Sequence, residues 1–241
     1  MLRALDVIQV RNGGAAVPTC MHPGMYATRA MRGADGNVRV FDDVPTAAEL
    51  ERYGARVIHS REAQTVVDDL FYISGEIPRV TPFGCGMPGQ VRRTADAAAW
   101  EPDPLLMDER FVAVRVKDNG VLVFTACSHA GVVKVLKHAR DSLAPHRLHG
   151  VMGDIHLSGS TESIIPETVN ELRAFGLTTI AAGHCTGWRV PLALSPRTCK
   201  RERRFLDWAS GVPRPLHRHS TLRWRIGKGG YVEWRLCRAL Q

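Results

Sequence analysis

The chain has 241 residues, of which 44% are hydrophobic and 23% charged. This composition supports a buried core and excludes a disordered, collagen-like or disulfide-dependent small protein. The net charge of +8 is unevenly distributed, because residues 189–241 hold 13 Lys and Arg against 3 Asp and Glu, whereas residues 1–188 hold 19 against 21. The basic character therefore belongs to the end of the chain, and the rest is slightly acidic.

The cysteine spacing and the first residues indicate in which cellular compartment the protein is expected. The six cysteines are at least 14 positions apart, so no Cys-x-x-Cys zinc motif is present. Asp6 lies where a signal peptide needs an apolar run, and no apolar stretch reaches the roughly 18 residues of a membrane span. We therefore expect a cytoplasmic protein with reduced thiols and no membrane contact.

The first half of the chain shows few regular patterns. Residues 1–45 are predicted to be irregular, and Thr46–Glu49 is a capping box that predicts a short helix ended by Gly54. Two stretches rich in β-branched and aromatic residues predict strands, namely 55–59 and 66–74. Residues 75–107 are rich in Pro and Gly and predict a long functional or mobile loop.

From Asp108 the pattern becomes regular. Two apolar runs separated by Asn119-Gly120 predict a hairpin over residues 111–126. Helices are predicted over 132–143 and 166–176, and strands over 148–152 and 177–182. This alternation predicts an α/β sheet layered with helices. A second hairpin is predicted near the end, from the alternating residues 222–226 and 232–236.

Three histidines follow three of the predicted strands. His129, His156 and His184 each come within a few residues of a strand end, beside Gly or Ser. Because the carboxyl ends of such strands line one crevice, the three imidazoles are expected to converge there. Imidazole is a common ligand for zinc and other transition metals. One such histidine alone is more often an ordinary residue, but three in the same role favour a metal site.

Neighbouring residues leave alternatives open. Asp154 lies two positions before His156, so alternation points both the same way and either could be the ligand; a turn residue beside Gly153 is the alternative. Cys127 and Cys185 flank the candidate histidines and are interpreted as small buried apolar residues.

Three charged residues outside these strand ends are also candidates. Glu76 and Arg79 precede the Pro- and Gly-rich segment, and either face a substrate or form a surface ion pair. Asp108 is either a carboxylate that orients a ligand histidine or part of a surface turn.

At these residues the chain resembles the metallo-β-lactamase superfamily, in the branch of the dihydropterin ribofuranosylaminobenzene phosphate synthase-like proteins. The stretches that carry the resemblance are Cys127–Gly131 (Cys-Ser-His-Ala-Gly), Gly153–Leu157 (Gly-Asp-Ile-His-Leu), His184–Gly187 (His-Cys-Thr-Gly), Gly75–Pro78 (Gly-Glu-Ile-Pro) and Asp108-Glu109. The resemblance implies an αββα sandwich and a metal-dependent hydrolase. It also implies that His129, His156 and His184 bind zinc or another divalent metal, with one or two ions in the complete site.

The sequence departs from the family in two places. The His-x-His-x-Asp-His motif that begins the family's metal site is absent, and the residues after Arg189 resemble nothing in the family. We therefore expect an incomplete metallo-β-lactamase domain over residues 1–189, truncated before its first strands and that motif, and a basic Arg/Pro/Trp-rich tail over 190–241. Because half of the implied metal site is missing, hydrolysis is expected to be weak or absent.

The sequence is compatible with three functions. The first is a metal-dependent hydrolase acting on a small-molecule substrate, although the branch includes a synthase. The second is nucleic-acid binding by the tail, where Trp208, Trp224 and Trp234 lie among arginines; no known module supports it, so a nucleic-acid partner is disfavoured. The third is a non-catalytic partner protein. Homo-oligomer formation is compatible with each of them.

Overall fold

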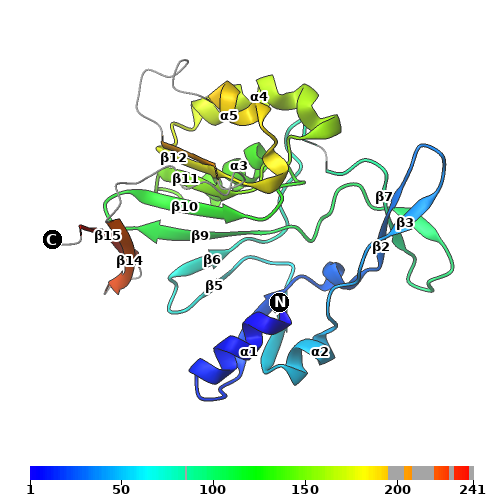
Figure 1. The fold of residues 1–241 in the computed structure, drawn as a ribbon, viewed down its shortest axis with the longest axis horizontal. Coiled ribbons are helices and arrows are strands. Elements are labelled where there is room, and N and C mark those ends of the chain that lie inside the picture. The colour runs from blue at the N-terminus through cyan, green and yellow to red at the C-terminus, as the bar shows by residue number, and fades with distance from the viewer. Residues whose placement is uncertain (85, 195–203, 208–219, 228–230, 239–241) are drawn as a thin grey trace. The chain divides into compact units, whose positions relative to one another are not determined.

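The computed structural model describes residues 1–84, 86–194, 204–207, 220–227 and 231–238. The chain forms two compact units, one of Met1–Glu62 with Gly86–Asp108 and one of Ala63–Cys85 with Glu109–Gln241 (Figure 1). The boundary at residue 189 between a metallo-β-lactamase-like domain and a basic tail stays a prediction. In the described part of the chain, no helix combines the length and the apolar character needed to cross a bilayer.

The first unit combines short helices with two small sheets. Its helices are α1 (Leu2–Arg11), η1 (Pro23–Tyr26) and α2 (Ala47–Arg52). Its strands are β1 (Val17–Met21), β2 (Arg29–Arg32), β3 (Val38–Val40), β4 (Ala55–His59), β7 (Gln90–Arg93) and β8 (Trp100–Pro102). β1 pairs with β4 in parallel, and β3, β2, β7 and β8 form an antiparallel sheet in that order.

Two predictions for this unit are confirmed and two are wrong. The capping box closes as expected, since the Thr46 hydroxyl accepts from the Glu49 N–H at 3.2 Å and the Glu49 carboxylate accepts from the Thr46 N–H at 2.8 Å. The strand over 55–59 is β4. Residues 1–45 are not irregular, because they hold α1, η1 and three strands, and the predicted loop over 75–107 holds β7 and β8.

The N-terminal helix was missed because its apolar side chains do not gather on one buried face. Leu5 is buried with Met21, Leu50 and Ala55 in a small core, whereas Val10 of the same helix is 85% exposed. An apolar residue on the solvent side weakens the helical period that sequence reasoning relies on.

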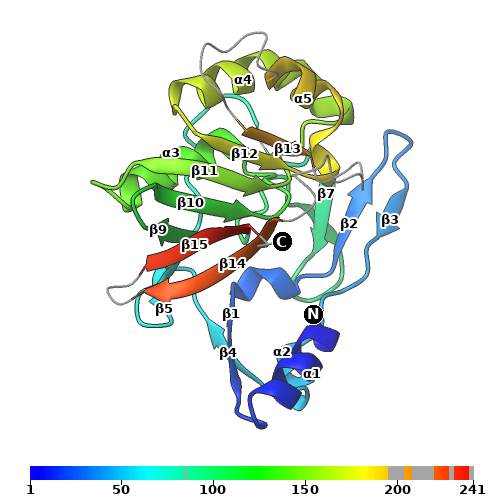
Figure 2. The ribbon, with the colours of Figure 1, turned by 60° about the vertical axis from the view of Figure 1, so that its left-hand side comes forward.

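The second unit is built on one large sheet. Its strands are β5 (Gln64–Val66), β6 (Phe71–Ile73), β9 (Phe111–Val116), β10 (Gly120–Thr125), β11 (Leu148–Gly153), β12 (Thr179–Ala182), β13 (Arg204–Asp207), β14 (Ser220–Gly227) and β15 (Tyr231–Arg238). The main order is β13-β12-β11-β10-β9-β15-β14, and β6 also pairs with β9. Strands β10 to β13 run parallel, whereas β9 is antiparallel to β10 (Figure 2).

In its described residues the second unit holds α-helices and short 3-10 helices. They are α3 (Val132–Ser142), η2 (Gly159–Ile164), α4 (Ile165–Ala174), η3 (His184–Thr186) and α5 (Arg189–Leu194). Apolar side chains of α3, α4 and α5 share one buried cluster with Phe111, Ala113 and Val123 of the strands. The alternate residues Val114 and Leu122 belong to a smaller cluster, as expected where successive side chains point to opposite faces.

Most of the elements predicted here are confirmed. The hairpin of β9 and β10, the helices α3 and α4, and the strands β11 and β12 lie where the sequence predicts them. The single strand predicted over 66–74 is wrong, because Val67, Asp68 and Asp69 take positive φ and turn the chain between β5 and β6. The C-terminal hairpin is confirmed as β14 and β15. Other parts of the expected tail, including Trp208, lie outside the described residues.

We expect His149 to make the second unit less stable in acid. His149 lies in β11 and is 7% exposed; burial lowers its pKa, and the charge of Arg147 acts in the same direction. Below about pH 6.5, the ordinary pKa of histidine, the unfolded chain therefore binds a proton that the folded chain resists. The free energy of unfolding should fall between pH 7.5 and 5.5 in urea titrations. His149→Gln should show a smaller fall, and an equal fall would contradict the role of this residue.

Candidate metal centre

The loop after β10 presents the first histidine through a tight, buried turn. Ser128 is 2% exposed and takes a φ of 56°, and its hydroxyl hydrogen-bonds to that of Thr125 at 2.8 Å. The Gly131 N–H donates to the Ser128 carbonyl at 2.8 Å and closes the turn before α3 begins. His129 is thereby held between the end of a strand and the start of a helix.

The loop after β11 presents the second histidine. The Asp154 N–H donates to the Ala126 carbonyl at 2.8 Å, which ties this loop to the loop after β10. The Ile155 N–H donates to the Thr186 hydroxyl at 3.1 Å, which ties it to η3 after β12. His156 itself has a φ of 41°, a conformation that few non-glycine residues adopt. Loops from three neighbouring strands therefore meet, as the sequence predicts.

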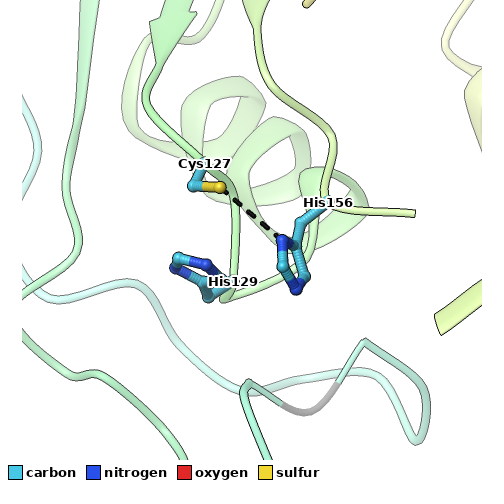
Figure 3. Close-up of side chains that lie close together, drawn as sticks. All are labelled: Cys127, His129 and His156. Atoms are coloured by element: carbon cyan, nitrogen blue, oxygen red, sulfur yellow. Dashed lines mark hydrogen bonds between the residues drawn. The ribbon is translucent and has the colours of Figure 1, made fainter. Parts of the chain in front are cut away.

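The structure brings Cys127, His129 and His156 together at this edge (Figure 3). One ligating atom from each lies within 4.8 Å of the other two. A hydrogen bond of 3.6 Å joins the Cys127 Sγ to the His156 Nδ1, and the two imidazole rings lie 4.4 Å apart between centroids.

These donors suit a divalent transition metal. A tetrahedral zinc ion lies about 2.3 Å from sulfur and 2.0–2.1 Å from nitrogen, which places its ligand atoms roughly 3.3–3.8 Å apart. The separation of the Cys127 and His156 atoms is within that range. Burial lowers the pKa of His156, and the neighbouring His129 lowers it further. The lowered pKa favours the neutral imidazole, which is the form that binds a metal.

Glu109 holds the loop that carries His129. Its carboxylate accepts hydrogen bonds from the N–H groups of His129 at 2.8 Å and Ala130 at 2.5 Å, and Oε1 lies 3.6 Å from the His129 Nδ1. This is the orienting role that the sequence analysis offered for Asp108. The Asp108 carboxylate instead pairs with Arg29 of the first unit at 2.6 Å. The sequence showed the acidic pair Asp108-Glu109 as a candidate. It did not show which of the two carboxylates contacts the loop of His129.

A second group of donors shares Cys127. Cys127, Asp154 and Cys185 also have ligating atoms within 4.8 Å of one another. Burial raises the pKa of the Cys127 thiol well above its usual range, and a hydrogen bond to Cys185 acts in the same direction. Sequence reasoning treated both cysteines as small apolar residues. The spacing of Cys127 and His129 in Cys-x-His could have indicated a metal-binding role for Cys127, because it lets two side chains of one loop point the same way.

The remaining predicted residues lie in the same unit. The backbone of His184 begins η3, directly after β12, but its side chain lies outside the described residues. Glu76 is half-buried in the loop after β6. Arg79 of that loop is also half-buried, and its Nη1 donates to the Ile77 carbonyl at 2.5 Å. Arg79 therefore contacts the backbone of its own loop. A substrate role for Glu76 or Arg79 stays a prediction.

We expect the fold at the candidate site to require glycine at position 153, the last residue of β11. Its φ is 138°, and a Cβ added there would lie 1.9 Å from the Thr125 carbonyl oxygen. Gly153→Ala should therefore lower the free energy of unfolding by about 3 kcal/mol or more, since both strain and a backbone clash are introduced. Gly159→Ala is the matched control, because its φ is also positive but the space around it is open. Equal losses in urea titrations of the two variants would contradict the clash.

The chain is similar to curated proteins over part of their length. No family model matches the chain. It is 30% identical over 83 residues to the 7,8-dihydropterin-6-methyl-4-(β-D-ribofuranosyl)-aminobenzene-5′-phosphate synthase of Methanocaldococcus jannaschii, an alignment covering 34% of this chain and 28% of that one. It is 29% identical over 194 residues to the bifunctional uridylyltransferase/uridylyl-removing enzyme of Caulobacter vibrioides, covering 76% of this chain and 20% of that one. The chain thus spans less than a third of the length of these curated relatives.

The fold has a clearer counterpart among solved structures. A metal-dependent hydrolase of the β-lactamase superfamily matches with a TM-score of 0.63 and 20% identity, over 82% of this chain and 70% of that one. The chain therefore has a mixed α/β fold of the metallo-β-lactamase type, as predicted. In this fold the candidate site lies in the loops that follow β10, β11 and β12.

Proposed function

We propose that the chain is a metal-dependent hydrolase of the metallo-β-lactamase type that acts on a small-molecule substrate. The observation that carries the proposal is the cluster of Cys127, His129 and His156 at the strand ends of a sheet with this fold. Zinc or another divalent metal is the proposed cofactor. His184 is proposed as a further ligand, because its backbone follows the next parallel strand.

The residues of the cluster have separate proposed roles. His129 and His156 bind the ion as neutral imidazoles, and Glu109 fixes the loop of His129. A bound divalent metal supplies Lewis-acid chemistry, which makes water a better nucleophile and polarises the bond under attack. The protein contributes donors on three short loops, and hydrogen bonds between these loops hold them in place.

In the form given by this sequence we propose that binding is limited to one ion and that hydrolysis is slow. The family resemblance implies a second set of ligands in a His-x-His-x-Asp-His run, and this sequence contains no such run. Three protein ligands are still enough for one zinc ion with an open position. The proposal therefore predicts a single site of reduced affinity.

Metal analysis tests this directly. Zinc binding would be measured by competition with a chromogenic chelator, for the wild type and for His129→Ala and His156→Ala. We expect at most one ion per chain, with the affinity reduced in both variants. Hydrolysis of phosphodiester, lactone and β-lactam substrates should be slow and should stop when the metal is chelated. Two tightly bound ions would overturn the single-site proposal, and hydrolysis that survives chelation and both substitutions would overturn the function.

A further inference from the structure

The two thiols at the strand ends are brought together from distant parts of the chain. Cys127 follows β10, and Cys185 lies in η3 after β12. Asp154, after the intervening β11, completes the group, and its ligating atom and both sulfurs lie within 4.8 Å of one another. Each of three consecutive parallel strands thus contributes one donor. All three residues are half-buried.

The chemistry of this group differs from that of the histidines. Thiolate ligands select zinc, cadmium or cobalt over magnesium and manganese, which prefer carboxylate, carbonyl and water oxygens. Two thiolates and a carboxylate carry three negative charges when ionised, and these repel one another unless a cation lies between them. In a tetrahedral zinc site two sulfurs lie about 3.8 Å apart, a separation within the limit that the structure sets for this group.

The backbone also favours a fixed arrangement of these donors. The Leu157 N–H donates to the Cys185 carbonyl at 3.0 Å, and the Gly183 N–H donates to the Gly153 carbonyl at 3.2 Å. The Asp154 carboxylate packs close against Gly183, where an added Cβ would lie 2.4 Å from its Oδ1. The loops that carry Asp154 and Cys185 are therefore held against each other before any ligand binds.

We propose that Cys127, Asp154 and Cys185 bind a thiophilic divalent cation, so that the metal of this protein is ligated by two thiolates. The inference rests on the proposed function and deepens it, since Cys127 is shared with the histidine group and one ion per chain is expected. On this view the site excludes magnesium and manganese. A tetrahedral ion bound by Cys127, Asp154 and Cys185 has one position left, which a histidine or a water molecule fills.

Cobalt(II) titration under reducing conditions tests the proposal. Cobalt bound to thiolate shows a sulfur-to-metal charge-transfer band in the near ultraviolet, and oxygen or nitrogen ligands alone do not give it. We expect the band in the wild type, saturating at one equivalent, with zinc displacing the cobalt and magnesium leaving it in place. Cys127→Ser and Cys185→Ser should each reduce the band and lower the affinity by about 100-fold or more, since even an outer partner of a metal ligand is worth about 10–100-fold.

Two further variants separate this inference from the proposed function. Cys20→Ser, in β1 of the first unit, is the matched cysteine control and should keep the full band. His129→Ala should weaken binding but keep the charge-transfer band. Cobalt binding without the band, or a band unchanged in Cys185→Ser, would overturn the thiolate proposal and leave the hydrolase proposal standing. In a further outcome, Cys185→Ser removes the band, whereas His129→Ala changes neither the band nor the affinity. That outcome supports the thiolate site and overturns the histidine ligation.

Discussion

Replacing Glu109 with glutamine is expected to lower the affinity for zinc by about 10- to 100-fold, the range found when a partner that orients a metal ligand is removed. The Glu109 carboxylate is 8% exposed and accepts from two successive N–H groups, those of His129 and Ala130. A glutamine amide has one acceptor oxygen, so one of these donors loses its partner and the loop of His129 is freed to move. The loss of negative charge beside the imidazole weakens the ligand further. Competition with a chromogenic chelator at constant pH measures the effect.

Asp108→Asn is the matched control for this substitution. It removes the same charge one position earlier, where the carboxylate pairs with Arg29 of the first unit. Asp108→Asn is expected to lower the stability but to keep the zinc affinity within about twofold of the wild type, because the Asp108 carboxylate bonds to Arg29 and Glu109 is the residue that holds the loop of His129. Equal losses of zinc affinity in the two variants would show that net charge, and not the orientation of His129, controls binding.

The part of the site that follows strand ends could be predicted from the sequence. The runs before Cys127 and Gly153 are apolar and β-branched, and the helices between them have a clear period. Order and spacing therefore locate the loops after β10, β11 and β12, and parallel pairing places these loops at one edge. His129 and His156 are together in the structure for this reason.

The finer details depended on contacts that no sequence pattern specifies. Whether Asp108 or Glu109 faces His129 is decided by where β9 begins and how the chain turns before it, and both residues have the same chemistry. The grouping of Cys127 with Cys185 depends on the register of three strands over a separation of 58 positions. Local propensity carries no information on such a pair, so an apolar role was the default interpretation for each cysteine.

Replacing Lys134 with methionine is expected to lower the free energy of unfolding by about 2–4 kcal/mol. Lys134 lies in the first turn of α3, directly after the loop of His129, and is 1% exposed. Its Nζ donates to the carbonyl oxygens of Phe83 at 2.6 Å and Gly84 at 2.7 Å. Methionine fills most of the same volume, but it leaves two carbonyls without a charged donor. Hydrogen bonds to charged groups contribute about 1.5–3 kcal/mol each.

Two effects oppose each other at Lys134, and their balance fixes the sign of the change. Burying an ammonium group costs several kcal/mol, so a well-packed apolar side chain is sometimes more stable than a buried charge. Here that cost is offset by two short charge-assisted hydrogen bonds, whose acceptors would both be stranded in the variant. Lys137→Met is the matched control, because its ion pair with Glu171 at 3.3 Å is partly exposed and should contribute less than about 1 kcal/mol. Urea titrations measure both variants, and a Lys134→Met protein as stable as Lys137→Met would show that desolvation outweighs the hydrogen bonds.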